Sequence, residues 1–207
     1  MTEGLFPRER SEPAPGAVHV PGWLPPKRQR ELVEACREFG RGPVAYASTV
    51  LPGGGVMSVR SLHLGRRWVP YRYLDGVDLE LPEWLVALGR EALVEAYGAH
   101  RGFTPDTGLV NFYGDGARMG MHQDKEERSP APVVSLSLGD TCVFRLGNTE
   151  GRGRPWTDVE LASGDLFVFG GPSRFAFHGV PKVYPGTAEP ALGLRGRLNI
   201  TLRETGL

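Results

Sequence analysis

Two segments of the chain place apolar residues at the spacing of an α-helix. The first is predicted over residues 27–39, directly after Pro25-Pro26, because proline is favoured where a helix begins. The second begins near Pro82 and is predicted to end at Gly98. Their apolar faces consist of Leu32, Val33, Cys36 and Phe39 in the first and Leu81, Trp84, Leu85, Leu88, Ala92 and Ala96 in the second. Both helices therefore suit packing against a core.

The rest of the pattern predicts strands. Residues 44–51 and 56–62 flank the turn Pro52-Gly53-Gly54-Gly55, which indicates a hairpin. After residue 104, short apolar segments alternate with Gly, Pro, Asn and Asp, and six strands are predicted, over residues 109–113, 133–138, 141–146, 159–161, 166–169 and 195–203. Many short strands without β-α-β alternation favour a mainly β fold, a sandwich or jelly roll with helices packed on one side.

Composition indicates one globular domain. The chain has 207 residues, and its 29 glycines and 18 prolines favour many turns over a helical bundle. Residues 1–17 are polar and proline-rich, so we expect a flexible tail there and a single domain over residues 18–207. No apolar run reaches the roughly 18 residues of a membrane span, and no signal peptide is recognisable, which predicts a cytoplasmic protein. Cys36 and Cys142 are predicted to be free thiols.

Charge excludes a globally basic nucleic-acid binder, because 24 Lys and Arg balance 24 Asp and Glu. The charge is uneven locally, since Arg60, Arg66, Arg67 and Arg72 occur with no acidic residue between them. Arginine suits bidentate contacts with phosphate. The segment is therefore either a phosphate-contacting surface or an ordinary solvated face.

Candidate chemistry begins with His122-Gln123-Asp124 and, far downstream, His178. Two histidines and one carboxylate form the facial triad of non-haem Fe(II) oxygenases, which leaves metal positions open for substrates. With 5 His and 24 acidic residues in the chain, one His-x-Asp spacing can occur by chance. Taken singly, His122 is equally well explained as a surface residue and His178 as a core residue. The interpretation depends on the combination with other motifs.

A second candidate feature is the predicted strand over residues 195–203. Side chains alternate along a strand, so Arg197, Asn199, Thr201 and Arg203 share one face. That face is either solvated or turned inward, where it would meet Asn111 and Tyr113. Two buried guanidinium groups need an anion. A small dicarboxylate would answer both, and an internal Asp or Glu partner is the alternative.

Taken together, these motifs resemble the AlkB family of Fe(II)- and 2-oxoglutarate-dependent nucleic-acid dealkylases. The resemblance extends from about residue 44 to 204 and is densest in LVNFYGDGARMGMHQDK (residues 109–125), VVSLSLG (residues 133–139), residues 164–174, His178-Gly179 and RLNITLR (residues 197–203). It implies a double-stranded β-helix core over about residues 105–204 and a nucleotide-recognition lid over about residues 44–75.

The resemblance also implies site residues. Iron would be held by His122, Asp124 and His178. The distal carboxylate of 2-oxoglutarate would meet Arg197, with Asn111, Tyr113 and Asn199 helping, and its metal-chelating end would lie near Arg203.

For the substrate, the resemblance implies a second group of residues: Met57, Ser58, Trp68, Tyr71 or Tyr73, Glu126 and Arg152. Trp68 would stack on the flipped base, with core packing as its alternative role. Glu126 stands where bacterial relatives often carry Asp, and either Tyr71 or Tyr73 takes the role of the family's tyrosine. Both points bear on substrate preference.

The expected activity is oxidative demethylation of N-alkylated bases in DNA, with RNA as a further option, releasing formaldehyde, succinate and CO2. Single strands should be favoured, because extruding a base costs least there. The protein is expected to act as a monomer without an obligate protein partner. The alternatives are the same chemistry on a protein, lipid or small molecule, a cupin-like enzyme that does not use 2-oxoglutarate, and a non-catalytic binding module.

Overall fold

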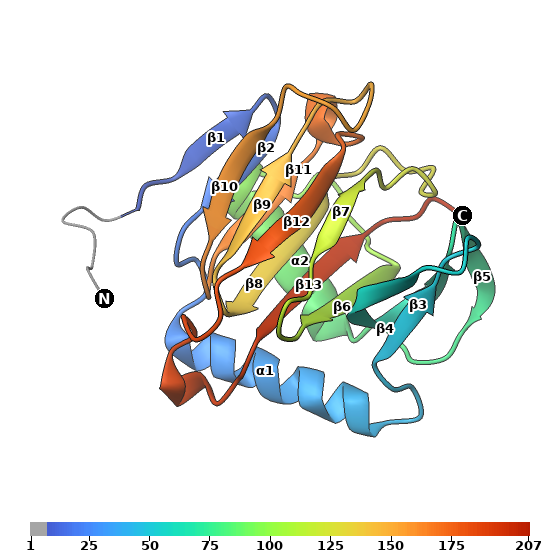
Figure 1. The fold of residues 1–207 in the computed structure, drawn as a ribbon. Helices are drawn as coiled ribbons and strands as arrows, with labels where there is room; N and C mark the ends of the chain where they lie inside the picture. Colours follow the sequence, from blue (N-terminus) through green and yellow to red (C-terminus); the bar gives the residue numbers. More distant parts are fainter. Residues whose placement is uncertain (1–7) are drawn as a thin grey trace.

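Two antiparallel sheets and two helices make up the computed structural model, which describes residues 8–207 (Figure 1). The larger sheet has the strand order β1-β2-β11-β8-β13-β6-β4-β3, with β5 paired to β4, and the smaller one has the order β10-β9-β12-β7. The elements are β1 (Ser11–Ala14), β2 (Ala17–Val20), α1 (Pro26–Arg41), β3 (Ala47–Val50), β4 (Val56–Val69), β5 (Arg72–Val77), α2 (Glu83–Tyr97), β6 (Thr107–Tyr113), β7 (Met119–His122), β8 (Val133–Gly139), β9 (Cys142–Leu146), β10 (Thr157–Leu161), β11 (Leu166–Phe169), β12 (His178–Val183) and β13 (Arg197–Arg203). This confirms the prediction of a mainly β fold with flanking helices.

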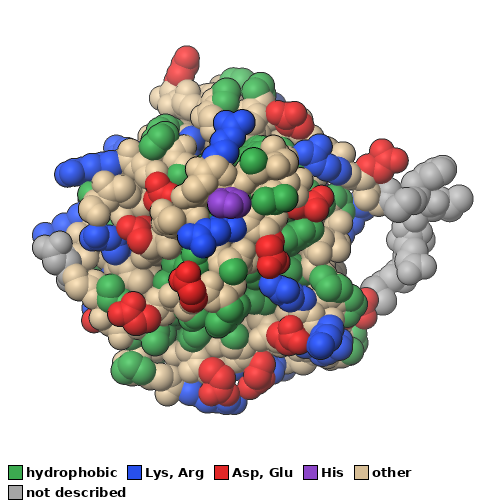
Figure 2. All heavy atoms as spheres, turned by 180° about the vertical axis from the view of Figure 1, so that it is seen from behind, with side chains coloured by type: hydrophobic (Ala, Val, Ile, Leu, Met, Phe, Trp, Pro, Cys, Tyr) green, Lys and Arg blue, Asp and Glu red, His purple; other side chains and the backbone are tan. Residues whose placement is uncertain are grey.

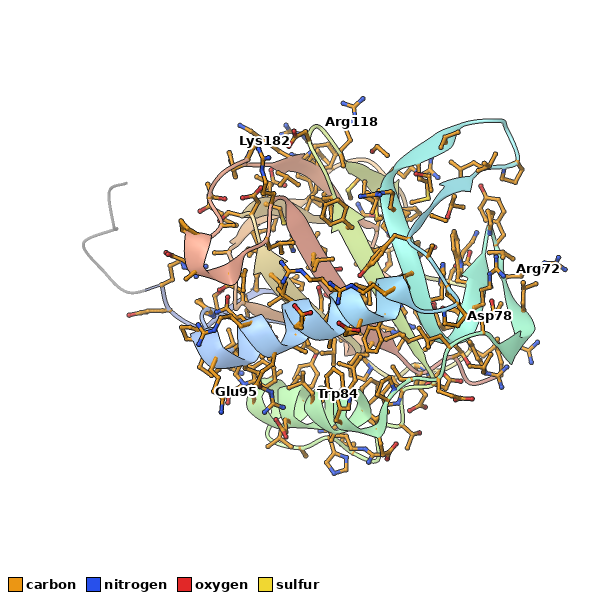
Figure 3. All side chains as sticks on the ribbon, turned by 90° about the horizontal axis from the view of Figure 1, so that it is seen from below. Arg72, Asp78, Trp84, Glu95, Arg118 and Lys182 are labelled. Atoms are coloured by element: carbon orange, nitrogen blue, oxygen red, sulfur yellow. The ribbon has the colours of Figure 1, made fainter. Side chains whose placement is uncertain are left out.

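Both helices pack on the outer face of the larger sheet, where Leu198, Ile200 and Leu202 of β13 join a core with the apolar faces of α1 and α2. The helices also touch each other, through the stacked rings of Phe39 and Trp84 at a centroid distance of 6.4 Å, and they lie side by side in Figure 3. With one face of β13 buried against helices, its polar face must point between the two sheets. The alternation predicted for this strand is confirmed, and its inward-facing alternative is the correct one.

The helix boundary predicted at Gly98 is also confirmed. Gly98 adopts a left-handed conformation with φ 78° and donates its backbone N–H to the carbonyl of Val94. A residue with a side chain would be strained there, so glycine ends α2 at this point.

The N-terminal segment differs from the prediction of a flexible tail over residues 1–17. Strands β1 and β2 fall partly or wholly inside that range, and β2 pairs with β11 in the larger sheet. The physical reason is the fully buried carboxylate of Asp165, which accepts hydrogen bonds from Arg8 and from the backbone N–H of Gly22, 2.9 Å away, and lies 2.9 Å from His19. The polar composition of residues 1–17 could not predict these contacts, because Asp165 is distant in the sequence. The part of the prediction that concerns residues 1–7 lies outside the described residues.

The predicted lid region is built on β4, which is longer than its predicted seven residues and bends at Gly65. Gly65 has φ +69°, and a Cβ atom there would lie 2.1 Å from the carbonyl oxygen of Asp106. Before the bend β4 pairs with β3 and β6, and after it with β5. The bend leaves the β3–β4 and β4–β5 hairpins side by side at one end of the larger sheet (Figure 1). That these hairpins act as a lid stays a prediction.

Charges of both signs are interspersed over the face seen from behind in Figure 2, in line with the zero net charge. In the local arginine-rich segment, Arg66 pairs with Asp106 at 3.1 Å and Arg67 with Asp78 at 3.0 Å. Neither helix within residues 8–207 has the length and apolar character needed to cross a membrane.

Candidate active site

The two predicted metal-ligating histidines are direct partners across neighbouring strands. His122 ends β7 and His178 begins β12, and their Cα atoms are in register in the antiparallel pair. Asp124 follows two residues after His122, and one ligand atom from each of the three residues lies within 4.8 Å of the others. The pairing of β7 with β12 thus brings together residues that are 56 positions apart in the sequence.

A backbone carbonyl orients each imidazole. Nδ1 of His122 lies 3.0 Å from the carbonyl oxygen of Gly120, and Nδ1 of His178 lies 3.0 Å from that of Ala176. Since a carbonyl can only accept a hydrogen bond, Nδ1 carries the proton in both rings. The unprotonated Nε2 atoms then face Asp124, at 3.7 Å for His122 and 3.5 Å for His178. This is the orientation that metal-binding histidines require.

The charge states also fit a divalent metal ion. Burial and the neighbouring His178 lower the pKa of His122 to about 4, so its imidazole is neutral at physiological pH. Burial acts to raise the pKa of Asp124, but the guanidinium of Arg203 and the ring of His178 hold it well below its ordinary value. Two imidazole nitrogens and one ionised carboxylate form a donor set that suits Fe(II).

Arg203 lies beside this group in a cluster of four buried charges. Its Nη2 is 2.9 Å from Oδ2 of Asp124, and its Nη1 donates to Oε1 of Glu127 at 3.0 Å. Arg174 lies 3.6 Å from the other oxygen of Glu127 and donates to the backbone carbonyl of Asp124 at 3.2 Å. Two arginines and two carboxylates cancel, so the cluster is neutral without a metal ion. The roles of Glu127 and Arg174 were not predicted, because nothing in the local sequences EERS (residues 126–129) and GPSR (residues 171–174) distinguishes a buried charge from an exposed one.

Arg197 is buried in a different environment. Its Nη2 donates to the hydroxyl of Ser137 at 2.9 Å and its Nη1 to the carbonyl of Asp140 at 3.4 Å, while Nε has no hydrogen-bond partner within residues 8–207. No carboxylate in that part of the chain forms an ion pair with Arg197. A buried guanidinium without a counter-ion is costly, so this position fits an anionic ligand.

The space between Arg197 and the histidines is a small cavity between the two sheets. Arginines 197 and 203 both line it, and no acidic residue does so in the described part of the chain. A ligand with one carboxylate at Arg197 and a second anionic end at the histidines matches this charge pattern. The polar residues that line the cavity include Asn111, Tyr113, Ser135, His122, His178, Asn199 and Thr201.

A larger cavity, of about 450 Å³, opens above the metal-ligating group. His122 and Asp124 lie in its lining together with six of the seven predicted substrate residues, which are Met57, Ser58, Trp68, Tyr71, Glu126 and Arg152. The predicted lid therefore faces the predicted metal site across one space.

The seventh predicted substrate residue, Tyr73, points elsewhere. Its hydroxyl donates to Oε1 of Glu127 in the buried charge cluster, whereas Tyr71 is 66% exposed at the cavity. The hydroxyl of Ser58 is also engaged, since it donates to the carbonyl of Arg118 at 3.0 Å and accepts from its N–H at 3.1 Å. The structure separates the two tyrosines, which the sequence could not do.

Comparisons with known proteins agree on one family. A family model described as the 2OG-Fe(II) oxygenase superfamily matches residues 16–203. The chain is 40% identical over 197 residues to an alpha-ketoglutarate-dependent dioxygenase AlkB homolog of Caulobacter vibrioides, covering 91% of this chain and 87% of that one. It is 35% identical to the DNA N(6)-methyladenine demethylase ALKBH1D of Arabidopsis thaliana, covering 91% of this chain and 49% of that protein. The solved structure of OsALKBH1 superposes with a TM-score of 0.85 at 31% identity, covering 95% of this chain and 100% of that one.

Proposed function

The chain belongs to the AlkB family of the 2OG-Fe(II) oxygenase superfamily, and we propose that it demethylates N-alkylated bases in nucleic acid. It is a dioxygenase that uses Fe(II), 2-oxoglutarate and O2. One observation carries the proposal of a nucleic-acid substrate: the metal-ligating group and the aromatic residues Trp68 and Tyr71 line the same open cavity.

His122, Asp124 and His178 hold Fe(II) in this proposal. Two observations support this assignment. One ligand atom from each of the three residues lies within 4.8 Å of the others, and a backbone carbonyl orients each imidazole ring. When bound, the iron and 2-oxoglutarate supply the oxidation of the N-methyl group, so that a methylated base, 2-oxoglutarate and O2 give the free base, formaldehyde, succinate and CO2.

Arg197 receives the distal carboxylate of 2-oxoglutarate, because it is buried without a carboxylate partner within residues 8–207. Tyr113 and Asn199 are its neighbours on β6 and β13, and Asn111 pairs with Asn199 across these strands. Arg203 stands at the metal-chelating end, beside Asp124. The distal carboxylate of the dianion then balances Arg197, and its other carboxylate offsets one of the two positive charges that a bound divalent metal ion would bring.

The target base enters the 450 Å³ cavity above the histidines, where Trp68 offers an aromatic face for stacking. Met57, Glu126 and Arg152 also line this cavity, and Ser58 fixes the hairpin to residue 118. Burial raises the pKa of Glu126, so this side chain is suited to donate or accept a hydrogen bond at a base edge. The base must leave its stack to reach the histidines, which favours single-stranded substrates.

DNA is the substrate that we propose first, because the Arabidopsis relative is a DNA demethylase, and RNA is the second to test. We propose that the protein works as a monomer, without an obligate protein partner, in the cytoplasm. The free, buried thiols of Cys36 and Cys142 support a reducing compartment.

The test is mass spectrometry of single-stranded oligonucleotides carrying 1-methyladenine or N6-methyladenine, incubated with the protein, Fe(II), 2-oxoglutarate and air. Succinate is measured in the same tube. Loss of the methyl group that depends on iron and 2-oxoglutarate is the expected result. Succinate without demethylation would redirect the search to a protein or small-molecule substrate. Asp124→Ala should abolish both products, whereas Asp115→Ala, at an exposed position before β7, should retain them.

A further inference from the structure

A second cavity, of about 660 Å³, lies behind Trp68 in the bend of β4. It is bounded by β3, by the β4–β5 turn and by Asp78, and its size lies in the roughly 300–1,000 Å³ range of ligand pockets. Thr49, Ser61 and Trp68 line both this cavity and the 450 Å³ cavity above the histidines, which is called the first cavity below. Trp68 therefore stands between two spaces that could each take a ligand.

His63 supplies the hydrogen-bonding groups of the second cavity. It lies two residues after Ser61 on β4, so both side chains point to the same side of the sheet. Its Nδ1 is buried with no hydrogen-bond partner among the described residues. An unpartnered buried nitrogen of this kind indicates a position where a ligand supplies the missing bond.

The charges around His63 favour a neutral ligand. Burial and the positive charges of Arg67 and Arg203 lower the pKa of His63 to about 4, so the ring is neutral and offers one donor and one acceptor. The guanidinium of Arg67 is 3.0 Å from the carboxylate of Asp78, and the two charges cancel. A heterocyclic base, with donors and acceptors on its edge, suits this lining better than a phosphate does.

The rim of the two cavities is apolar. Val50 is 62% exposed at the second cavity, and Val56 and Tyr71 are 64% and 66% exposed at the first. These are the three most exposed large apolar side chains of residues 8–207, and a ligand bound in the two cavities would cover them. In Figure 3, Arg72 lies at the outer edge of the β4–β5 hairpin, and Asp78, which lines the second cavity, lies closer to the body of the protein.

We propose that the second cavity binds the base of the nucleotide next to the flipped one, so that Trp68 is stacked between two consecutive bases of one strand. The inference rests on the proposed function and adds a neighbouring-base subsite to it. Both nucleotides must be unpaired at the same time. The subsite therefore gives a physical reason for preferring single strands over duplexes, where a second pair would have to open.

The test uses short single-stranded oligonucleotides with 1-methyladenine at the centre and an abasic tetrahydrofuran unit on its 5′ side, on its 3′ side or on neither. Binding to the iron- and 2-oxoglutarate-loaded protein is measured anaerobically by fluorescence anisotropy, and KM for demethylation is measured in air. We expect the abasic unit on one side, and not on the other, to raise both Kd and KM about tenfold, the size expected for loss of one stacked base.

His63→Ala should lower the affinity for the intact oligonucleotide and reduce the difference between intact and abasic oligonucleotides to about twofold or less. The matched control is His100→Ala, an exposed histidine on the loop after α2, which should keep the discrimination of the unmodified protein. The subsite is wrong if neither abasic oligonucleotide binds the unmodified protein more weakly, a result that needs no variant to fold. If no methylated oligonucleotide binds or is demethylated, the proposed function itself fails.

Discussion

Arg203 and Asp124 form a buried ion pair in which Nη2 of the guanidinium lies 2.9 Å from Oδ2 of the carboxylate. Arg203 is 6% exposed and Asp124 is 4% exposed, so water screens this pair little. The contact keeps Asp124 ionised and holds its Oδ2, which also lies 3.5 Å from Nε2 of His178, while Oδ1 lies 3.7 Å from Nε2 of His122. A residue that sequence resemblance connected to 2-oxoglutarate thus also supports the metal-ligating group.

Arg203→Gln should weaken metal binding as well as 2-oxoglutarate binding. Loss of a residue that orients a metal ligand typically costs about 10–100-fold in metal affinity. The variant should also lower the free energy of unfolding by about 3–5 kcal/mol, because the two buried carboxylates of Asp124 and Glu127 are left with the single guanidinium of Arg174. Anaerobic metal titration and urea unfolding measure the two effects.

The matched control is Arg145→Gln, which removes an exposed pair with Asp158 on β9 and β10. Its free energy of unfolding should change by about 1 kcal/mol or less. Unchanged metal affinity in Arg203→Gln would show that Asp124 is held by other contacts.

Arg197→Met should separate binding of 2-oxoglutarate from binding of the metal ion. Arg197 contacts neither His122 nor His178, so metal affinity should stay close to that of the unmodified protein. Without ligand, the variant should lose little stability, because it removes a buried charge that has no carboxylate partner within residues 8–207. With 2-oxoglutarate at about 100 times its Kd, the unmodified protein should gain about 2.7 kcal/mol of stability and the variant almost none. Calorimetric unfolding with and without 2-oxoglutarate measures this gain in stability. An equal gain in both proteins would show that Arg197 does not bind 2-oxoglutarate.

Much of the fold was predictable because its signals are local. The apolar face of α2, the αL glycine that ends it and the alternation along β13 each depend on residues close in sequence. The triad could be predicted because two histidines and an aspartate on facing strands form an uncommon chemical pattern. The family resemblance added a function to that pattern.

What could not be predicted depends on contacts between distant segments. The strands β1 and β2 exist because Asp165, more than 140 residues away, offers a buried carboxylate to Arg8 and His19. Glu126 and Glu127 are adjacent and chemically alike, yet Glu127 is buried among arginines and Glu126 lines the open cavity. Only the packed structure separates such pairs.

The two tyrosines of the β5 region should have different effects when substituted. Tyr71 has φ 69°, a conformation that suits glycine better than an aromatic residue, so Tyr71→Gly should keep or raise stability. If its exposed ring contacts the substrate, the same variant should raise KM for a methylated oligonucleotide by about fivefold or more. Steady-state kinetics beside thermal unfolding measure both quantities.

Tyr73→Phe is the comparison variant. It removes the hydroxyl that donates to Glu127, which should lower stability by about 1–2 kcal/mol while the oligonucleotide KM stays the same. The reverse result, with KM changed in Tyr73→Phe and unchanged in Tyr71→Gly, would assign the substrate role to Tyr73.

Asp165→Asn should destabilise the protein at neutral pH but not in acid. Burial acts to raise the pKa of Asp165, and hydrogen bonds from His19, Arg8 and the backbone outweigh it and hold the pKa below its ordinary value of 3.8. A carboxyl group with a depressed native pKa stabilises the folded state above its unfolded pKa, and the contribution is lost as pH falls through the native value. The variant should therefore be less stable by about 3 kcal/mol from about pH 7 to pH 5, and the difference should shrink below about pH 4. Urea unfolding across this pH range measures the difference in the free energy of unfolding.

Asp158→Asn is the control, because its carboxylate is 42% exposed and its pair with Arg145 should contribute about 1 kcal/mol or less. A pH-independent loss in Asp165→Asn would mean that packing, rather than the ionised carboxylate, holds β1 and β2 on the sheet.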